Sequence, residues 1–376
     1  MRTLLMAGTG LMALSAAVAQ QRSTRRSADI HAASVPSPSW SAKAAAAYLD
    51  GRMTWWLGWR NSARDHETSC ISCHTAVPYA LGRRALRPLL GEHAPTAPEQ
   101  QMLANVVKRV RLWREVEPFY PDQTVGLPKT SESRGTEAVL NALVLSRRDA
   151  ESGALSEDAR LAFDNMWQLQ FKSGDLKGAW AWLNFGLEPW EATRSPYFGA
   201  ALAAIAVGSA PGGYAAAPEN AERVKSLVAF LQRGADSSHL FNRVMILWAS
   251  SQLPDVLTPA RRQAIVDAAL AAQHEDGGWS IASLGPFPRI DSTAPEAHSD
   301  GYATGLMLLS LQRAGLDRSD ARVRKGLDWL ATTQDTTTGM WVSRSANKAR
   351  DLKTDVGKFM SDAATAYAVM ALTEGH

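Results

Sequence analysis

Apolar residues recur at intervals of three and four along most of the chain, and alternating strand patterns are nearly absent. This periodicity predicts an all-α protein. The predicted helices are of two kinds. Residues 259–273 and 320–334 carry apolar side chains on one face, whereas residues 199–207 and 363–372 are apolar almost all round. A helix that is apolar on every side has to be buried on every side, so we expect inner helices covered by amphipathic outer ones.

The two kinds of helix alternate along the chain as six pairs. The second helices are predicted to start near Cys70, Arg134, Arg194, His239, His298 and Ser361. Each pair alone leaves an apolar face uncovered, and stacking against neighbouring pairs covers it. Six hairpins that close into a barrel leave no exposed end. We therefore predict an (α/α)6 toroid, with a ring of buried helices inside a ring of amphipathic ones.

The N-terminal residues have the features of an export signal. Arg2 supplies the positive start, residues 4–18 the apolar region, and Ala17-Val18-Ala19 the small-residue cleavage site. The sequence therefore predicts a signal peptide over residues 1–19, cleaved after Ala19, and a periplasmic location. A Pro/Ser-rich flexible linker over residues 20–39 and a helical domain over residues 40–376 are expected to follow.

The composition is that of a globular protein with a sizeable core. Hydrophobic residues make up 45% of the chain and charged residues 20%. The formal charge is +3 and the basic residues are scattered, so nothing favours nucleic acid as a partner. No segment after the signal has a long uncharged apolar run, so we expect the mature protein to be soluble rather than membrane-spanning. Thirteen tryptophans are the unusual feature.

Several of these tryptophans recur in a turn that follows an amphipathic helix. Gln334 precedes Gly339-x-Trp341, in a segment that begins with Lys325-Gly326 and contains Trp329-Leu330, and Gln273 precedes Gly277-Gly278-Trp279. Gln170 and Trp180 form a looser third copy. This pattern resembles the Gln-Trp repeat of squalene–hopene cyclases and related terpenoid cyclases. The resemblance implies an (α/α)6 barrel around a central cavity, with the Gln and Trp side chains joining the end of an outer helix to the next turn.

The same resemblance does not carry the usual chemistry of these families. Terpenoid cyclases protonate their substrate from an Asp-x-Asp-Asp motif, which this chain lacks, and they usually contain two barrels, whereas this chain has the length for one. Protein prenyltransferase β-subunits share the barrel and hold zinc with Asp, Cys and His. No cysteine lies in the C-terminal repeats here, so that zinc site is not expected.

Both cysteines of the chain lie in one short motif, Cys70-x-x-Cys73-His74. This is the spacing at which haem c is attached: two thioether bonds from the cysteines, with the following histidine as iron ligand. Export of the chain favours that interpretation. A disulfide between the two cysteines and a metal such as zinc are the alternatives. By the register of the repeats, the motif opens the first inner helix and faces the cavity mouth.

If haem is bound, a second iron ligand is needed or the sixth position is open. We expect His298, because "APEAHSDGY" gathers polar groups at a predicted mouth position. His239, Met360 and His66 are the other candidates.

Three carboxylates are predicted at the same mouth. Asp300 and Asp362 occupy equivalent positions of two repeats, each after a serine, and Glu137 is expected to open the second inner helix. A carboxylate at a helix N-terminus caps the helix. The alternative is that Asp300, Asp362 and Glu137 are catalytic acid–base groups or ligand anchors.

Two functional hypotheses follow from the sequence. The first is an exported haem c protein in electron transfer or oxidoreduction, with a redox partner protein and an apolar cavity for a hydrophobic or isoprenoid small molecule. The second is a non-haem cyclase-like or lipid-binding protein with a Cys70–Cys73 disulfide, in which Asp300 and Asp362 carry any chemistry.

Overall fold

The computed structural model describes residues 40–375, which belong to one compact unit. The predicted signal peptide and the whole of the predicted linker therefore lie outside the described residues. Within the described range the protein is helical, and its strands are the two-residue strands β1 (Ala63–Arg64) and β2 (Thr68–Ser69). The all-α prediction is confirmed.

The predicted amphipathic helices and the predicted buried helices alternate along the chain. The amphipathic set is α1 (Ala42–Gly58), α4 (Ala97–Arg111), α7 (Glu157–Gln168), α9 (Ala221–Ser237), α11 (Pro259–Ala271) and α13 (Ala321–Thr333). The buried set is α2 (Ala76–Gly82), α6 (Lys129–Asp149), α8 (Pro196–Ser209), α10 (Leu240–Gln252), α12 (Gly301–Arg313) and α14 (Phe359–Thr373). Short helices α3 (Arg87–Leu90) and α5 (Asp122–Val125) lie in the connections.

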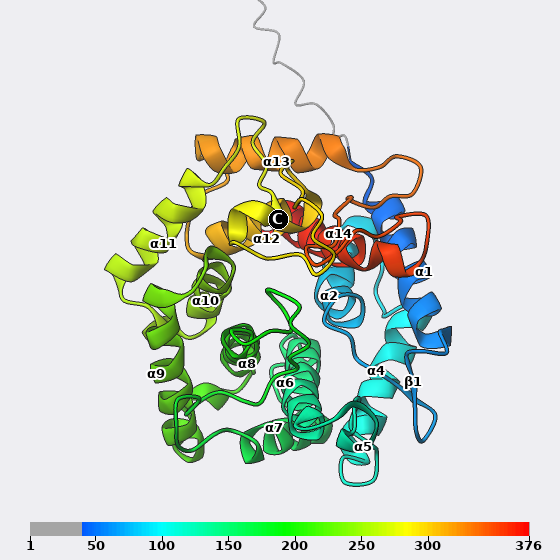
Figure 1. The fold of residues 1–376 in the computed structure, drawn as a ribbon, viewed down its shortest axis with the longest axis vertical. Coiled ribbons are helices and arrows are strands. Elements are labelled where there is room, and N and C mark those ends of the chain that lie inside the picture. Colours follow the sequence, from blue (N-terminus) through cyan, green and yellow to red (C-terminus); the bar gives the residue numbers. More distant parts are fainter. Residues whose placement is uncertain (1–39, 376) are drawn as a thin grey trace, which may run out of the picture. The chain divides into compact units, whose positions relative to one another are not determined.

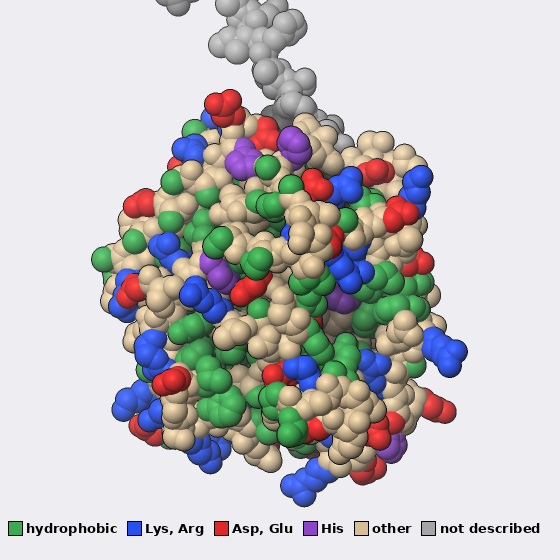
Figure 2. Space-filling model, viewed as in Figure 1, with side chains coloured by type: hydrophobic (Ala, Val, Ile, Leu, Met, Phe, Trp, Pro, Cys, Tyr) green, Lys and Arg blue, Asp and Glu red, His purple; other side chains and the backbone are tan. Residues whose placement is uncertain are grey.

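The buried helices are neighbours of one another in a closed series. α2 contacts α6, and α6 contacts α8. The series continues through α10, α12 and α14, and α14 contacts α2 again. Figure 1 shows α13, α11 and α9 outside α12, α10 and α8. Figure 2 shows, in the same view, hydrophobic side chains in the middle of this face, with charged side chains among them and along its margin.

Sequence explains why the inner helices are buried. In α8, all residues from Phe198 to Val207 are buried, and half of them are alanine, so neighbouring helices approach closely. Pro196 stands at the first helical position, where its missing N–H is not needed. α14 is buried from Met360 to Leu372. Burial of apolar area of this extent is the main source of stability in the fold.

The three Gln-Trp turns join the ends of α7, α11 and α13 to the starts of the next outer helices. The Gln334 Nε2 after α13 donates to the carbonyl oxygens of Gly339 (2.8 Å) and Ser41 (3.1 Å), and its Oε1 accepts from the Ser41 N–H. Trp341 Nε1 donates to the Leu330 carbonyl at 2.8 Å. Because Ser41 caps α1, this turn connects the last outer helix to the first. The bonding role expected for Gln and Trp is confirmed.

The other two turns repeat this geometry. Gln273 Nε2 donates to the carbonyls of Gly277 and Arg322, and Gln170 Nε2 to those of Gly178 and Arg223. Each turn needs glycine: Gly178, Gly277 and Gly339 have φ of +95°, +98° and +81°. A Cβ on Gly339 would also lie 2.3 Å from the Ala44 carbonyl oxygen. At these three turns the glycine therefore allows the close approach to the next outer helix.

No helix within residues 40–375 is long and apolar enough to cross a membrane.

Candidate functional site

The Cys70–His74 motif lies in an anchored loop between β2 and α2. The Cys70 N–H donates to the Ser62 carbonyl (2.8 Å), and Trp56 Nε1 donates to the Cys70 carbonyl (2.7 Å). Ser72 Oγ then accepts from the Thr75 and Ala76 N–H groups, which turns the chain into α2. The motif thus precedes the inner helix, which begins a few residues later than the register predicted.

Cys73 and His74 form part of the wall of a cavity of about 200 Å³. The remaining walls are mostly apolar or aromatic, with four polar side chains among them. The lining includes Tyr120, Leu187, Trp190, Glu191, Phe198, Tyr302, Ser345, Asn347, Arg350, Phe359, Met360 and Tyr367. These residues come from the inner helices α8, α12 and α14 and from loop segments at 73–74, 120, 187–191 and 345–357, so the cavity forms only when distant parts of the chain come together.

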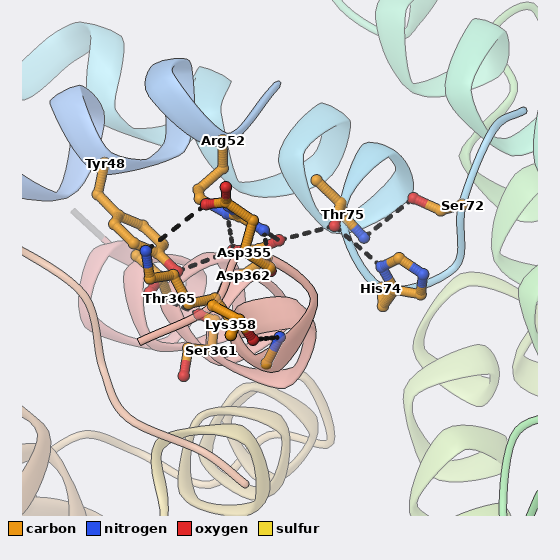
Figure 3. A network of polar contacts seen from close by, with 12 residues as sticks. Tyr48, Arg52, Ser72, His74, Thr75, Asp355, Lys358, Ser361, Asp362 and Thr365 are labelled. Atoms are coloured by element: carbon orange, nitrogen blue, oxygen red, sulfur yellow. Dashed lines mark hydrogen bonds and ion pairs between the residues drawn. The ribbon is translucent and has the colours of Figure 1, made fainter. Parts of the chain in front are cut away.

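The hydrogen bonds of His74 define its tautomer. His74 Nδ1 lies 2.9 Å from Thr75 Oγ1, and the Thr75 hydroxyl donates to Asp362 Oδ2 at 2.7 Å. Since the Thr75 proton goes to the carboxylate, the Thr75 oxygen accepts the Nδ1–H of His74. Nε2 is then left with a free lone pair. Figure 3 shows the second ring nitrogen pointing away from this network.

Aromatic side chains hold the His74 ring in place. Phe359 stacks on it with ring centroids 3.9 Å apart, and Trp56 meets it edge-on at 5.2 Å. Burial lowers the pKa of His74 to about 3, with smaller contributions from Arg350 and Arg52. The imidazole is therefore neutral over the physiological range, which is the form that binds metal ions.

Asp362 is the centre of the network that orients His74 (Figure 3). Arg52 donates to both of its oxygens, from Nε at 2.7 Å and Nη2 at 3.1 Å, and the Tyr48 hydroxyl donates at 2.8 Å. Asp362 is 1% exposed, and burial raises its pKa, but the fixed charge of Arg52 and the four donors favour the carboxylate. Arg52 also binds Asp355 at 2.8 Å. Asp362 is thus a positioning residue for His74.

Sequence reasoning missed Tyr48, Arg52, Asp355 and Thr75. Tyr48 and Arg52 stand four positions apart in α1, so both reach the same face of the helix. That spacing was a usable signal. Their partner lies over 300 residues further along the chain, and no local pattern connects the two segments.

The structure corrects the expectation for Glu137. Helix α6 begins at Lys129, so Glu137 lies in its interior and does not open it. Its carboxylate is fully buried and binds Arg109 through both oxygens. Arg109 also donates to Thr68 Oγ1 at 2.6 Å. Because Thr68 is in β2, this ion pair fixes the strand that leads into the motif, and Glu137 does not line the cavity.

Asp300 and His298 lie at a different pocket. The Asp300 carboxylate caps α12 by accepting from the N–H groups of Tyr302 and Ala303, and it also accepts from Ile281 N–H and the Ser343 hydroxyl. His298 is exposed and lines this second pocket, not the cavity of His74. The capping interpretation of Asp300 is confirmed, and the structure does not bring His298 to His74.

Of the other candidate iron ligands, Met360 is the one that lines the cavity with His74. His239 caps α10 and lies 3.8 Å from Glu188, and His66 is exposed beside Asp65. The preference for His298 over Met360 followed from the polar sequence around His298. In the structure Ser299, next to His298, hydrogen-bonds to His274 and donates to Asp276 of the preceding turn, so these polar groups do not face the cavity of His74.

Cys70 and Cys73 are free thiols. Burial raises the pKa of Cys70 to about 12 and raises that of Cys73 as well, so both are protonated. Among residues 40–375, no three or more His, Cys, Asp or Glu side chains gather as a metal-holding group.

A scan of this chain against protein-family models finds no match, and a search of curated proteins finds none either.

Proposed function

We propose that this chain is an exported haem c protein, in which Cys70 and Cys73 form thioether bonds to the haem vinyl groups and His74 binds the iron through Nε2. One observation carries the proposal: the Thr75 hydroxyl, held by Asp362, accepts the Nδ1–H of His74 and leaves Nε2 free. Iron-ligating histidines are oriented in this way by a second hydrogen bond. The motif has the required spacing, and the predicted export signal places it where covalent attachment occurs.

The closed series of contacts from α2 through α14 supports the (α/α)6 toroid as the framework of this site. The Gln334–Ser41 bonds support it as well, because they join the last outer helix to the first. In such a toroid the cavity of His74 opens among the N-terminal ends of the inner helices.

The residues present fit a haem. The neutral imidazole of His74, with a free nitrogen, and the thiol of Cys73 stand at one wall, with Cys70 three residues before Cys73 on the same loop, and Met360 provides a sulfur ligand within the same cavity. Arg350, also in the wall, makes no side-chain hydrogen bond or ion pair with any described residue, so its charge is available for a haem propionate. A cavity of about 200 Å³ lies below the roughly 300–1,000 Å³ that enclose a drug-sized ligand. Part of the haem would therefore stay exposed at the mouth.

An exposed haem edge suits electron exchange with a redox partner protein. When bound, haem supplies one-electron transfer at iron. The chain contributes the rest: Asp362 and Thr75 orient the imidazole, and aromatic walls exclude water from one side of the site. The apolar lining would also accept a hydrophobic or isoprenoid molecule beside the iron, so oxidoreduction of such a molecule is the second form of this function.

The alternative is a non-haem protein that binds an apolar molecule in the same cavity. The aromatic lining favours it, but its two proposed acids do not stand together: Asp300 lines another pocket, and Asp362 is occupied by four donors. Acid catalysis in this cavity would need a different carboxyl group.

Intact mass of the exported protein tests the proposal. Expression with a haem-attachment system should add the mass of one haem and give haem absorption that survives acid–acetone extraction. The Cys70→Ala/Cys73→Ala variant is the matched control, because the chain has no other cysteine. A colourless wild-type protein that has lost the mass of two hydrogens would instead establish the disulfide and refute the haem.

A further inference from the structure

Glu191 is held rigidly at the wall of the His74 cavity. Its N–H donates to the Leu187 carbonyl, and its own carbonyl accepts from the N–H groups of Leu187 and Phe185, all at 2.8–2.9 Å. The neighbouring Trp190 is fixed by its Nε1, which donates to the Tyr302 hydroxyl at 2.9 Å. The loop that carries Glu191 is therefore anchored at both its backbone and its side chains.

The Glu191 carboxyl group lines the cavity without a partner. It makes no side-chain hydrogen bond or ion pair with any residue between 40 and 375, and aromatic side chains such as Trp190 and Tyr302 form the wall around it. An unpaired carboxylate in apolar surroundings is unfavourable, so a fold that retains one either keeps it protonated or provides a counter-charge when it ionises.

Charged and titratable groups reach this carboxyl from each side of the cavity. Lys129 of α6 is the cation that favours its ionised form, but the ammonium group is already bound to Glu132 and to the Asn184 carbonyl. Cys70, Cys73 and Tyr120 interact with it electrostatically and are neutral. His74, Arg350, Tyr302 and Tyr367 line the same cavity.

The balance of these effects leaves Glu191 able to exchange a proton near neutral pH. Burial raises the pKa of Glu191 to about 7, and Lys129 opposes this only in part. Among the acids proposed from the sequence, none combines such a position with a free carboxyl group: Asp300, Asp362 and Glu137 are all fully hydrogen-bonded.

We propose, building on the haem function above, that Glu191 takes up one proton when the redox centre of this cavity accepts one electron. The electron comes from a one-electron donor protein, and the proton comes from water at the mouth and forms an O–H bond on the Glu191 carboxylate. An added negative charge in a low-dielectric cavity favours protonation of the nearest free carboxylate. The charge of the cavity is then the same before and after reduction.

The test is a potentiometric titration of the haem-loaded full chain from pH 5 to 9. In the wild type the midpoint potential should fall as pH rises above 7, approaching a slope of about 59 mV per pH unit, which corresponds to one proton per electron. Glu191→Gln should be nearly independent of pH in this window, and Glu191→Asp should retain the dependence. Glu188→Gln is the matched control, because Glu188 stands on the same loop but does not line the cavity.

A second measurement follows the carboxyl group itself. The infrared difference between reduced and oxidised protein should contain a carboxylic C=O band that Glu191→Gln removes and Glu188→Gln retains. Unchanged pH dependence in Glu191→Gln, with the band retained, would overturn the inference while the haem function stands. Absence of haem from the wild type would overturn both, and the mass measurement shows this before any titration.

Discussion

Replacing Thr75 with valine isolates the hydroxyl that connects Asp362 to His74. Thr75 is 2% exposed, and valine has nearly the same shape, so the change removes hydrogen bonds without opening a large cavity. Two bonds are lost: the one that Thr75 donates to Asp362 and the one that it accepts from His74 Nδ1. Asp362 keeps three other donors, two from Arg52 and one from Tyr48.

The cost can be worked out from these two bonds. A hydrogen bond to a charged group contributes roughly 1.5–3 kcal/mol. The low end applies because the Asp362 carboxylate still accepts hydrogen bonds from its three other donors. The Nδ1–H of His74, left unpaired and buried, costs roughly 1–3 kcal/mol more. We therefore expect Thr75→Val to lower the free energy of unfolding by about 3 kcal/mol. Loss of a partner to a ligating histidine typically costs roughly 10–100-fold in metal affinity or activity.

Urea unfolding of the haem-free protein and the absorption spectrum of the loaded protein measure the two effects. Thr75→Val should shift the unfolding midpoint and change the iron–histidine environment, since the ring loses the hydrogen bond that orients its Nδ1. Thr75→Ser keeps the hydroxyl and should stay close to wild type in both measurements. Equal behaviour of the valine and serine variants would refute the orienting role of the hydroxyl, and so would an unchanged spectrum in Thr75→Val.

Four further predictions follow from the same structure. Glu137→Gln leaves the buried Arg109 with only the Asp65 carboxylate, 3.7 Å away, as counter-charge and should cost about 3 kcal/mol in urea unfolding, while Glu137→Asp should cost less. Asp300→Ala removes the cap of α12 and should cost roughly 2 kcal/mol, but mass spectrometry should find haem attachment unchanged. Gln334→Ala removes the bonds that join α13 to α1 and should cost roughly 2–3 kcal/mol; an unaltered thermal midpoint would contradict it. In the haem-free protein, the pKa of Glu191 is about 7 in the folded state and near 4.5 in the unfolded state. The folded state therefore binds the proton more tightly, and the wild type loses up to about 3 kcal/mol of stability as pH rises from 4.5 to 7. Glu191→Gln should not show this loss.

The positions of the inner helices could be predicted from sequence because their apolar surfaces are continuous. α8, α10, α12 and α14 begin within three residues of the expected starts. The exceptions were α2, which begins at Ala76, after the motif, and α6, which begins at Lys129 although its first turns are polar. Lys129 at its start pairs with Glu132 one turn further on and donates to the Asn184 carbonyl of a distant loop, and hydrophobic periodicity does not register such polar contacts.

The candidate site was predictable only in its local part. Cys70, Cys73 and His74 form one motif, and the structure brings Cys73 and His74 to one cavity. Asp362 was singled out for its repeat position, yet its role follows from Arg52 and Tyr48, which come from the opposite end of the chain. Glu191 carried no motif at all. Glu191 was identified because its carboxyl group has no hydrogen-bond or ion-pair partner among residues 40–375. That can be seen only in the folded protein, where the cavity has formed.

The bonds between Gln334 and Ser41 have a consequence for how the protein comes apart. In an open array of repeats, the terminal units have one neighbour each, and they fray before the middle unfolds. Here hydrogen bonds join the last repeat to the first, so neither terminal repeat lacks a neighbour. Thermal unfolding is then expected to be a single cooperative transition of the whole domain. Without the bonds between Gln334 and Ser41, the first and last repeats would each have one neighbour and would unfold before the rest.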